Sequence, residues 1–412
     1  MLRYGIIGGG FITEFHLRAL ESVRDVEVAG LVSASPPHRL AASARVRGLG
    51  EARVFETITE MLPHVDVVAV FSPNFSRIAA MEEVAAARVD HLKGIICEKP
   101  LGRNMQESGR MVELADAIGV PTAYFENQIH MKALTQARTQ LDDVRQTMGP
   151  PVLVRSAEEH AGPHRSWFWD PIQQGGGVLS DMGCHSIAVG WYLLTPAGKH
   201  PTHLVPETVL ADVGLLKWGQ PKWRSELFDL HGVDYDATPA EDFATGMVTY
   251  RNPETGMRSK GQFTVSWMYD KQGLRLLIDA IGPGYALEFN TLRSPLEVFV
   301  GDAAAVSLVD AGSALEKATA SRGLLAVQPN EPDLYGYTDE NVDAAKCFEA
   351  GQSALLDFRY GQEIVRLTMA SYLSAETGQV VHLDDPQTRR HLDDYVPLIQ
   401  QGRGAEVFPR HR

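Results

Sequence analysis

Residues 3–13 read RYGIIGGGFIT, and this stretch decides the fold. An apolar run that predicts a strand leads into three glycines, and apolar residues at helical spacing follow them. Gly8 permits a tight turn, and Gly10 permits a close approach of the backbone to a pyrophosphate, which the N-terminus of the helix would stabilise. The third glycine of the usual pattern is Thr13 in this chain. The position of the turn in a first strand–helix–strand unit still predicts a dinucleotide-binding turn.

The first 125 residues repeat this alternation of short apolar runs and helical patterns. Such alternation predicts right-handed crossovers and a parallel sheet covered by helices. The run 65–71 is apolar at nearly every position, as expected for a strand that is buried on both faces. The predicted strands are 3–7, 26–32, 65–71, 94–97 and 122–125, and the predicted helices are 11–23, 40–46, 76–88 and 104–118.

The pattern changes after residue 126. Turn signals such as Asn252-Pro253 separate several short strand patterns, which favours a largely antiparallel sheet. We therefore expect an α/β fold with a dinucleotide-binding domain at 1–126, a second α/β domain at 127–383 and a polar C-terminal extension at 384–412. Residues 195–240 are rich in proline and give no clear pattern. The second domain should hold strands at 152–157, 243–250, 262–268, 274–281, 285–290 and 296–300, and helices at 132–145, 178–194, 339–350 and 362–375.

The composition narrows the class of protein. The 412 residues carry 38 Lys and Arg against 52 Asp and Glu, a formal charge of −14, which disfavours nucleic acid and anionic membrane surfaces as partners. The spacing of Cys97, Cys184 and Cys347 fits neither a zinc motif nor a disulfide framework, so we expect no structural metal and a cytoplasmic location. No apolar stretch is long enough to span a membrane.

The second predicted strand ends in Leu31-Val32-Ser33-Ala34-Ser35. An acidic residue at this point would bind the ribose hydroxyls of NAD. Ser33 carries no charge that would repel a 2′-phosphate, and the guanidinium of Arg39 is near enough in sequence to attract one. The sequence therefore favours NADP, with NAD as the alternative cofactor.

Two charged motifs are candidates for chemistry. Lys99 directly follows a buried strand, and ligands of parallel sheets bind beyond the carboxyl ends of the strands, so Lys99 should face the cofactor. Asp181 and His185 follow the glycines 175–177 and are four residues apart, so on a helix they share one face. A carboxylate and an imidazole in this arrangement can move a proton. A surface ion pair at Lys99 and a buried structural histidine at His185 are the alternatives.

Together these motifs resemble the Gfo/Idh/MocA oxidoreductase family. The resemblance rests on the glycine turn, Ser72-Pro73-Asn74, Glu98-Lys99-Pro100 and the run 175–185, and it covers roughly residues 1–383. It implies a Rossmann domain followed by an α/β domain with an open, mostly antiparallel sheet, which in a homodimer or homotetramer would join the subunits. By position it implies the catalytic residues Lys99, Asp181 and His185, and the cofactor contacts Gly8, Gly10, Phe11, Ile12, Ser72, Pro73, Asn74, Glu98 and Lys99.

The chain departs from the pattern of the family at two positions besides the missing ribose-binding acid. Arg77 stands where a histidine is common, a few residues beyond the Pro-Asn turn. Asn127 lies in a stretch that often reads Asn-x-Arg in the family and reads Glu-Asn-Gln in this chain. We keep Asn127 as an expected cofactor contact.

The expected reaction interconverts a secondary alcohol and a ketone on a sugar, polyol or related hydroxy compound, with a hydride exchanged at the nicotinamide C4. His185 would act as the general base, because histidine changes its charge near neutral pH. Lys99 would hydrogen-bond the same oxygen, and Asp181 would orient one of the two. The roles of Lys99 and His185 can also be exchanged.

The loop 158–170 supplies further expected contacts. Its aromatic rings and polar groups suit a sugar ring, so His160, His164 and Trp167 are expected to join Lys99, Asp181 and His185 at the substrate. Trp169 is expected to flank the nicotinamide. A packed interface between domains is the alternative for the aromatic residues. The two histidines do not predict a zinc site, because Gly162-Pro163 between them breaks a helix.

Two other classes of function stay open at this point. One is a nicotinamide-dependent glycosidase that oxidises its substrate transiently, for which Tyr269 or Tyr285 would supply a further acid or base. The other is a regulator that binds the cofactor without turnover. The joint presence of Lys99, Asp181 and His185 favours an enzyme over the regulator.

Overall fold

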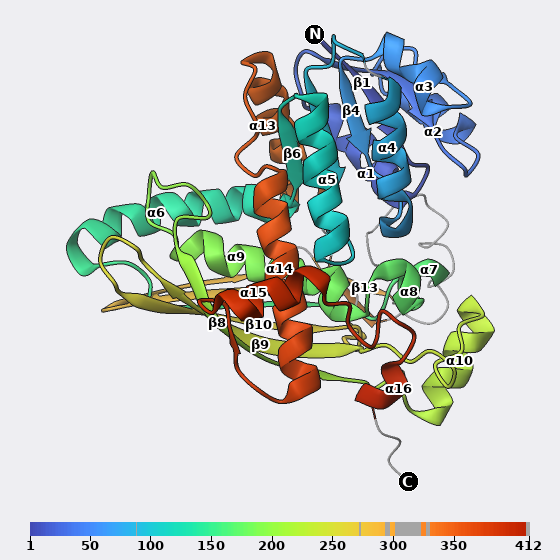
Figure 1. Cartoon of the computed structure of the whole chain (residues 1–412). Coiled ribbons are helices and arrows are strands. Elements are labelled where there is room, and N and C mark those ends of the chain that lie inside the picture. The colour runs from blue at the N-terminus through green and yellow to red at the C-terminus, as the bar shows by residue number, and fades with distance from the viewer. Residues whose placement is uncertain (88, 272, 293–296, 301–322, 327–329, 409–412) are drawn as a thin grey trace. The chain divides into compact units, whose positions relative to one another are not determined.

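The computed structural model describes residues 1–87, 89–271, 273–292, 297–300, 323–326 and 330–408. The chain forms two compact units (Figure 1). The first unit consists of residues 1–135 and 332–366, and the second of residues 136–331 and 367–412. This division differs from the expected boundaries, because residues 332–366 return to the first unit and the C-terminal residues belong to the second.

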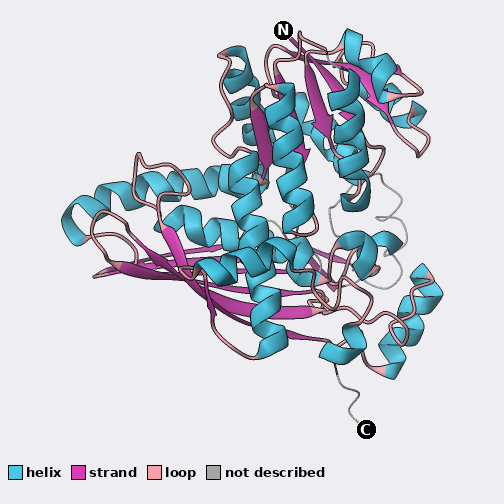
Figure 2. Ribbon diagram, in the orientation of Figure 1, coloured by secondary structure: helices cyan, strands magenta, loops and turns pink. Residues whose placement is uncertain are grey.

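The first unit is built on a six-stranded sheet in the order β3-β2-β1-β4-β5-β6, in which all neighbouring strands are parallel (Figure 2). This is the expected Rossmann sheet, with the strand order reversing between β1 and β4. The expected strands and helices are all present, and short elements such as β3, α3 and three 3-10 helices were missed. The elements of this part are β1 (Leu2–Ile7), α1 (Phe11–Leu20), β2 (Val26–Val32), α2 (His38–Val46), β3 (Arg53–Val54), α3 (Ile58–Met61), β4 (Val67–Val70), α4 (Arg77–Ala87), β5 (Gly94–Glu98), α5 (Met105–Ile118), β6 (Thr122–Phe125), η3 (Asn127–His130) and α13 (Tyr337–Glu349).

Helices cover both faces of this sheet, as its apolar strands require. Helices α4 and α5 lie together over one face (Figure 1). On the other face, side chains of α1, α2 and α13 join those of the strands in one apolar core. Helix α13 comes from far along the chain, and its Phe348 ring lies against β5, where a Cβ on Gly94 would be 2.4 Å from the ring. The returning segment therefore completes the core of the first unit.

The second unit is built on a seven-stranded sheet in the order β12-β11-β7-β10-β9-β8-β15. Only β7 and β10 pair in parallel among these neighbours, so the expectation of a mostly antiparallel sheet is confirmed. Helix α9 packs on β7 and β10, and Gly190 and Gly261 let its backbone lie close to the sheet. The elements are α6 (Lys132–Met148), β7 (Leu153–Glu159), α7 (Ser166–Trp169), α8 (Pro171–Gln174), η4 (Leu179–Gly183), α9 (Cys184–Leu194), β8 (Val205–Gly214), α10 (Pro221–His231), β9 (Phe243–Arg251), β10 (Arg258–Ser266), β11 (Arg275–Gly282), β12 (Tyr285–Asn290), α14 (Phe358–Thr377), β15 (Val381–His382), α15 (Pro386–Asp394) and α16 (Gly404–Val407).

Two sequence expectations for the second unit need correction. The proline-rich stretch 195–240 contains the long strand β8 and the helix α10. The expected strand 296–300 begins at a residue outside the described ranges. Its described part, β13 (Glu297–Val300), pairs with β14 (Gly323–Ala326) in a separate two-stranded sheet.

The C-terminal residues are a packed part of the second unit rather than an extension. Leu392 in α15 and Ile399 after it are fully buried. A Cβ on Gly404 would lie 2.0 Å from the carbonyl oxygen of Pro239, so the chain packs tightly here. The polar composition of this segment concealed its packing, which rests on a few buried residues such as Leu392, Tyr395 and Ile399.

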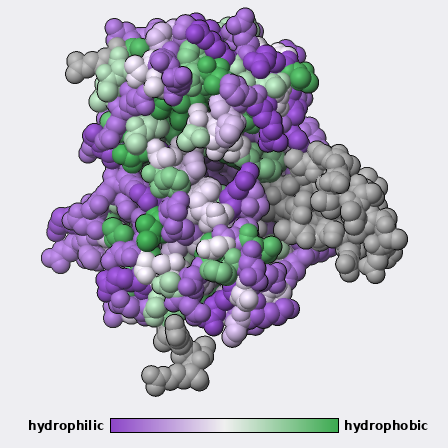
Figure 3. All heavy atoms as spheres, turned by 90° about the vertical axis from the view of Figure 1, so that its right-hand side faces the viewer, coloured by the Kyte–Doolittle hydropathy of each residue, from purple (hydrophilic) through white to green (hydrophobic). Residues whose placement is uncertain are grey.

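The surface of the described residues is mixed in character. The face in Figure 3 is largely hydrophilic, with hydrophobic residues interspersed. On the second unit, Leu210 and Met247 are exposed on β8 and β9, as expected for an open sheet face. Among the described residues, no helix combines the length and the apolar character that crossing a membrane requires.

Candidate functional site

The glycine turn between β1 and α1 leaves open space in front of a helix N-terminus. Gly8 has φ +134°, and a Cβ there would lie 2.7 Å from the carbonyl carbon of Phe71. Gly10 caps α1 with no side-chain hydrogen bond, and a Cβ on it would meet nothing within 4 Å. Thr13, which replaces the third glycine, is buried and donates its hydroxyl to the Gly8 carbonyl at 3.0 Å. The turn is therefore held in shape by Thr13 and open to an anion at Gly10.

The end of β2 lies against this turn. A Cβ on Gly9 would be 2.3 Å from the hydroxyl oxygen of Ser33, so the middle glycine makes room for the serine. Ser33 in turn accepts a hydrogen bond from the amide of Ser35 at 3.0 Å. Arg39 is exposed in the first turn of α2. The structure thus places Ser33 beside the glycine turn and Arg39 on the nearby helix.

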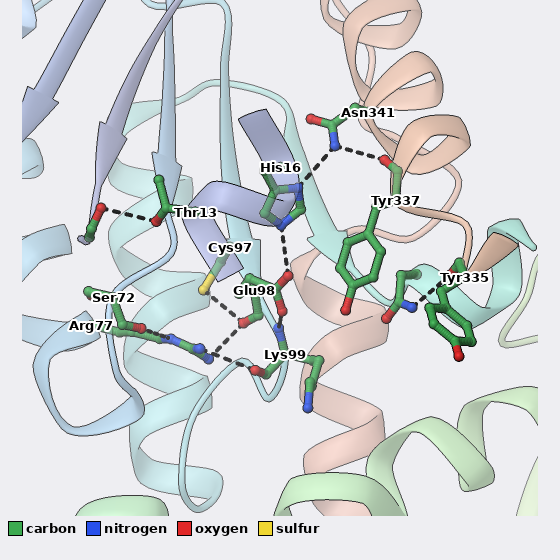
Figure 4. A network of polar contacts seen from close by, with 12 residues as sticks. Thr13, His16, Ser72, Arg77, Cys97, Glu98, Lys99, Tyr335, Tyr337 and Asn341 are labelled. Atoms are coloured by element: carbon green, nitrogen blue, oxygen red, sulfur yellow. Dashed lines mark hydrogen bonds and ion pairs between the residues drawn. The ribbon is translucent and has the colours of Figure 1, made fainter. Parts of the chain in front are cut away.

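Lys99 follows β5 at the carboxyl edge of the parallel sheet, as the sequence predicts. The side chain is half-buried, and the Lys99–Pro100 peptide bond is cis. The buried guanidinium of Arg77 lies under this turn and donates to its carbonyl oxygens. In Figure 4 the ammonium end of Lys99 points away from Arg77. Arg77 therefore fixes the backbone of the turn, and the ammonium group of Lys99 stays clear of Arg77.

A chain of hydrogen bonds reaches the same turn from α13 (Figure 4). Asn341 donates through Nδ2 to the Tyr337 carbonyl at 2.8 Å and to Nδ1 of His16 at 3.1 Å. Nε2 of His16 lies 2.9 Å from Oε1 of Glu98, and Oε2 of Glu98 accepts the Lys99 amide at 3.0 Å. Since Nδ1 of His16 accepts, its proton is on Nε2 and is donated to Glu98.

Glu98 is consequently ionised. Burial pushes its pKa upward, but the hydrogen bond from His16 and the positive charges of Lys99 and Arg77 bring the pKa of Glu98 below its ordinary value. Asn127, an expected cofactor contact, is also buried here and donates Nδ2 to the Tyr335 carbonyl at 2.7 Å.

Glu340 is a buried acid that the sequence analysis missed. Its carboxylate oxygens have no hydrogen-bond partner among the described residues, and ligand atoms of His16, Glu98 and Glu340 lie within 4.8 Å of one another. Both nitrogens of His16 are already engaged, so the cluster fits a proton on Glu340 better than a metal ion. Burial, and then the charges of Glu98 and Glu126, raise the pKa of Glu340 well above its ordinary value.

The wild type should lose stability as pH rises and Glu340 becomes ionised, and we expect Glu340→Gln to be free of this loss. Because the pKa of Glu340 is higher in the folded state than in the unfolded state, its contribution is present at low pH and lost as pH rises through the folded-state value. Thermal unfolding should therefore show the variant gaining on the wild type as pH rises above the ordinary glutamate range. Glu349→Gln, an exposed change on the same helix, is the control. Parallel pH profiles for wild type and Glu340→Gln would contradict the expectation.

In the second unit, Asp181 and His185 are both buried and lie in successive helical segments. The expected α-helix begins instead with a π-helical turn, η4, which carries Asp181 and leads into α9 at His185. Such wide turns are frequent at functional sites. The amide of Asp181 donates to the Gly177 carbonyl at 3.2 Å, so the glycines continue directly into the helix.

The glycines before Asp181 are held by a residue that the sequence analysis missed. Oε1 of the fully buried Glu241 accepts the amides of Gly177 at 2.9 Å and Leu179 at 3.1 Å, and the Tyr372 hydroxyl at 2.5 Å. A Cβ on Gly176 would lie 2.0 Å from the Tyr372 oxygen. Burial raises the pKa of Glu241 to about 7, although its hydrogen bonds oppose this. The only sequence signal was a pair of acids directly before an apolar strand.

The loop before the glycines holds the other expected substrate residues. His160 is buried, and its Nδ1 accepts the Gly162 amide at 2.9 Å. His164 is exposed, and Trp167 is half-buried and stacks on Phe168 with 3.8 Å between ring centroids. His164 and Trp167 are thus the members of this set with surface available to a ligand.

Trp169 belongs to an aromatic cluster. Its ring is buried and packs against Trp218 and Trp267 at 4.9 Å and against Tyr235 at 6.0 Å between centroids. Its Nε1 donates to the Pro163 carbonyl at 3.0 Å. This packing favours the alternative of a packed interface for Trp169, and its contact with the nicotinamide stays a prediction.

The candidate residues divide between the two units. The glycine turn, Ser33, Glu98 and Lys99 belong to the first unit, and Asp181 and His185 to the second. Within the first unit, the carboxyl edge of the sheet brings the expected cofactor residues together.

The chain is similar to known oxidoreductases. Residues 2–125 match the model of an oxidoreductase family with an NAD-binding Rossmann fold, and residues 136–280 match the GFO/IDH/MocA C-terminal domain. An uncharacterized protein of Saccharomyces cerevisiae, YMR315W, is 27% identical over 211 residues, which are 48% of this chain and 57% of that protein. Glucose-6-phosphate 3-dehydrogenase of Bacillus subtilis is 24% identical over 198 residues, which are 47% of this chain and 54% of that enzyme.

A solved structure covers much more of the chain. The crystal structure of GenD2 from gentamicin A biosynthesis, in complex with NAD, has a TM-score of 0.72 and 22% sequence identity, and covers 93% of this chain and 97% of that protein. At this identity the likeness establishes the fold. The chain spans little more than half the length of the curated relatives it matches.

Proposed function

Because the chain belongs to the Gfo/Idh/MocA oxidoreductase family, we propose that it is an NAD(P)-dependent dehydrogenase or reductase acting on CH–OH groups. Its substrate class is a sugar, polyol or related hydroxy compound that carries a secondary alcohol or the matching ketone. The carrying observation is the open glycine turn at Gly10, on the same sheet edge where Lys99 leaves a buried strand. Ligands of such sheets bind at this edge.

The residues of the first unit fit a dinucleotide. Gly10 leaves space before the uncapped N-terminus of α1, where a pyrophosphate would be stabilised. The uncharged Ser33 beside the turn and the exposed Arg39 favour NADP over NAD. The residues that would hold the cofactor are Gly8, Gly10, Phe11, Ile12, Ser33, Arg39, Ser72, Pro73, Asn74, Glu98, Lys99 and Asn127.

A bound nicotinamide supplies the hydride acceptor or donor. In the proposed site, His185 takes the proton of the substrate hydroxyl when the alcohol is oxidised and returns it to the oxygen in the reverse direction. Lys99 hydrogen-bonds the same oxygen and stabilises its developing negative charge. Asp181 orients Lys99 or His185, and His160, His164 and Trp167 bind the remainder of the substrate. The open sheet face of the second unit would join subunits in a homodimer or homotetramer.

A screen of sugars, polyols and glycosides in both directions tests the proposal, with NAD and NADP compared and the absorbance of the reduced nicotinamide followed. Net reduction of NADP by at least one polyol or sugar, or its reverse, is the expected result. Cofactor binding without turnover on the whole panel would contradict the proposal. Cleavage of an aryl glycoside without net change of NAD(P)H would point to the glycosidase reading instead.

A pair of glycine variants tests the cofactor site separately. Gly10→Ala should leave the melting temperature unchanged, because its Cβ would enter open space at φ −85°, yet it should weaken NAD(P) binding by about 10-fold by occupying the space for a pyrophosphate. Gly8→Ala should lower the melting temperature as well, since φ is +134° and the Cβ would meet the Phe71 backbone. Unchanged cofactor affinity in Gly10→Ala, measured by NADPH fluorescence, would argue against this site.

A further inference from the structure

We propose that Arg77 is a positioning residue that fixes the Lys99 turn relative to the Ser72 turn. This inference rests on the proposed function in one respect, namely that Lys99 takes part in the reaction. Arg77 lies three residues after Asn74, which ends the Ser72-Pro73-Asn74 turn. It is the first residue of α4 and is 5% exposed, so its charge is inside the protein.

The guanidinium of Arg77 donates to four backbone carbonyl oxygens from two strand ends. Figure 4 draws its contacts with Ser72, Glu98 and Lys99. Nε donates to the Ser72 carbonyl at 3.0 Å, which lies just beyond β4. Nη1 donates to the carbonyls of Glu98, at 2.7 Å, and Pro100, and Nη2 to that of Lys99 at 3.1 Å. One side chain therefore fixes the whole Lys99 turn and joins it to its neighbour.

No other side chain can make this set of contacts. Arginine has five N–H donors in one plane, whereas a histidine has one when neutral and two when charged. A lysine keeps the charge and has three donors, but they radiate from a single nitrogen. A histidine at position 77 would leave at least two of the four carbonyls without their present donor. The donors of arginine therefore match the four carbonyl oxygens that hold the turn.

The buried charge of Arg77 has a local counter-charge. The Glu98 carboxylate is ionised, held by His16 and by the Lys99 amide, and the positive charge of Arg77 contributes to that ionisation. Both charged groups hydrogen-bond the backbone of the same turn, Arg77 at its carbonyls and Glu98 at the Lys99 amide, and their charges offset each other. Because Arg77 and Glu98 both hydrogen-bond this backbone, the turn has little conformational freedom.

The consequence for catalysis is geometric. The Ser72 turn holds expected cofactor contacts, and Lys99 is an expected catalytic residue, so Arg77 sets the distance between them. A displacement of about 1 Å in a reacting geometry can cost about 10²-fold in rate. We therefore expect Arg77 to act on kcat through the placement of Lys99, without touching substrate or cofactor.

Kinetics of Arg77 variants test this. Arg77→Met should lower kcat by about 10²-fold with KM for the alcohol within about 3-fold of wild type, and Arg77→Lys should recover about 10-fold of that loss. Arg77→His should resemble Arg77→Met more than the wild type. Arg110→Met is the matched control, since Arg110 is an exposed arginine of the same unit whose ion pairs are to Glu82 and Glu113. Wild-type kcat in folded Arg77→Met, or an equal loss in Arg110→Met, would overturn the proposal.

A second readout separates this proposal from the proposed function. Reductive methylation of the half-buried Lys99, followed by mass spectrometry, reports the environment of its amine without any turnover. We expect the methylation rate of Lys99 to change by at least about 5-fold in Arg77→Met. In Arg77→Lys the rate should lie between those of the wild type and of Arg77→Met. The methylation rate of Lys93 should stay unchanged in both variants. If the wild type turns over no hydroxy compound, the proposed function fails. The role of Arg77 is overturned as well only if the methylation rate of Lys99 is also unchanged in Arg77→Met. If Arg77→Met does not fold, the Arg77→Lys rates decide in the same way.

Discussion

Alanine at Lys99 or at His185 is expected to lower kcat by about 10²-fold or more, the usual effect of removing a positioned acid–base group. Lys99 is presented from the end of β5, and His185 is buried at the start of α9. Each would lose its part in handling the hydroxyl proton, while cofactor binding should persist in His185→Ala. Steady-state kinetics in the oxidative direction, with the cofactor saturating, measure the effect.

The matched controls are Lys93→Ala and His200→Ala, which remove exposed residues of the same types from the first and second units. Both controls should keep the wild-type kcat. Near-normal turnover in both Lys99→Ala and His185→Ala would remove the catalytic assignment, and with it the proposal that the two residues meet at one reacting carbon.

The second large effect is expected at Glu241, in stability. Glu241→Leu removes the acceptor of the Gly177 and Leu179 amides and of the Tyr372 hydroxyl. Each buried donor left without a partner costs about 1–3 kcal/mol, so we expect a loss of about 3 kcal/mol or more in the free energy of unfolding. Denaturant unfolding measures it. Because the glycines before Asp181 lose their support, any folded fraction should also show a lower kcat.

Glu241 also gives stability a dependence on pH. Burial raises its pKa to about 7, against an ordinary value of 4.5. A group whose pKa is raised on folding stabilises the protein at low pH, and this contribution falls as pH rises from about 4.5 to about 7. The difference corresponds to about 3 kcal/mol. Glu241→Gln cannot ionise, so its unfolding free energy should lack this fall.

Glu254→Gln, an exposed change in the same unit, controls for general charge effects. The decisive comparison is the slope of the unfolding free energy between about pH 5 and pH 8. Equal slopes in wild type and Glu241→Gln would show that Glu241 is ionised in the folded protein throughout this range. The loop would then be held by a permanent carboxylate.

The sequence predicted five of the six strands of the first sheet, but not the residues that hold its functional edge. These strands are rich in apolar residues and alternate with helices, so their positions and their parallel pairing could be predicted from period and length. The glycines and Lys99 could be placed because they interrupt that pattern at a strand end. Arg77 and Glu340 could not, since an arginine or a glutamate within a helix is normally on the surface.

The second unit was harder to predict for a related reason. Strand β8 was hidden in a proline-rich stretch, and its residues belong to the sheet only through pairing with β9, which lies far along the chain. Glu241 binds backbone amides rather than a side chain of complementary charge, so no sequence partner revealed it. The packing of Trp169 could not be predicted, because an aromatic core and a stacking surface have the same composition.

The return of α13 to the first sheet affects how the protein can be made. One face of that sheet depends on Ala344, Ala345 and Phe348 for its apolar cover. During synthesis on the ribosome, nearly 350 residues must therefore emerge before the nucleotide-binding half can close its core. Truncation after residue 135 would leave that half with a bare, aggregation-prone surface, and a single proteolytic cut cannot release it whole.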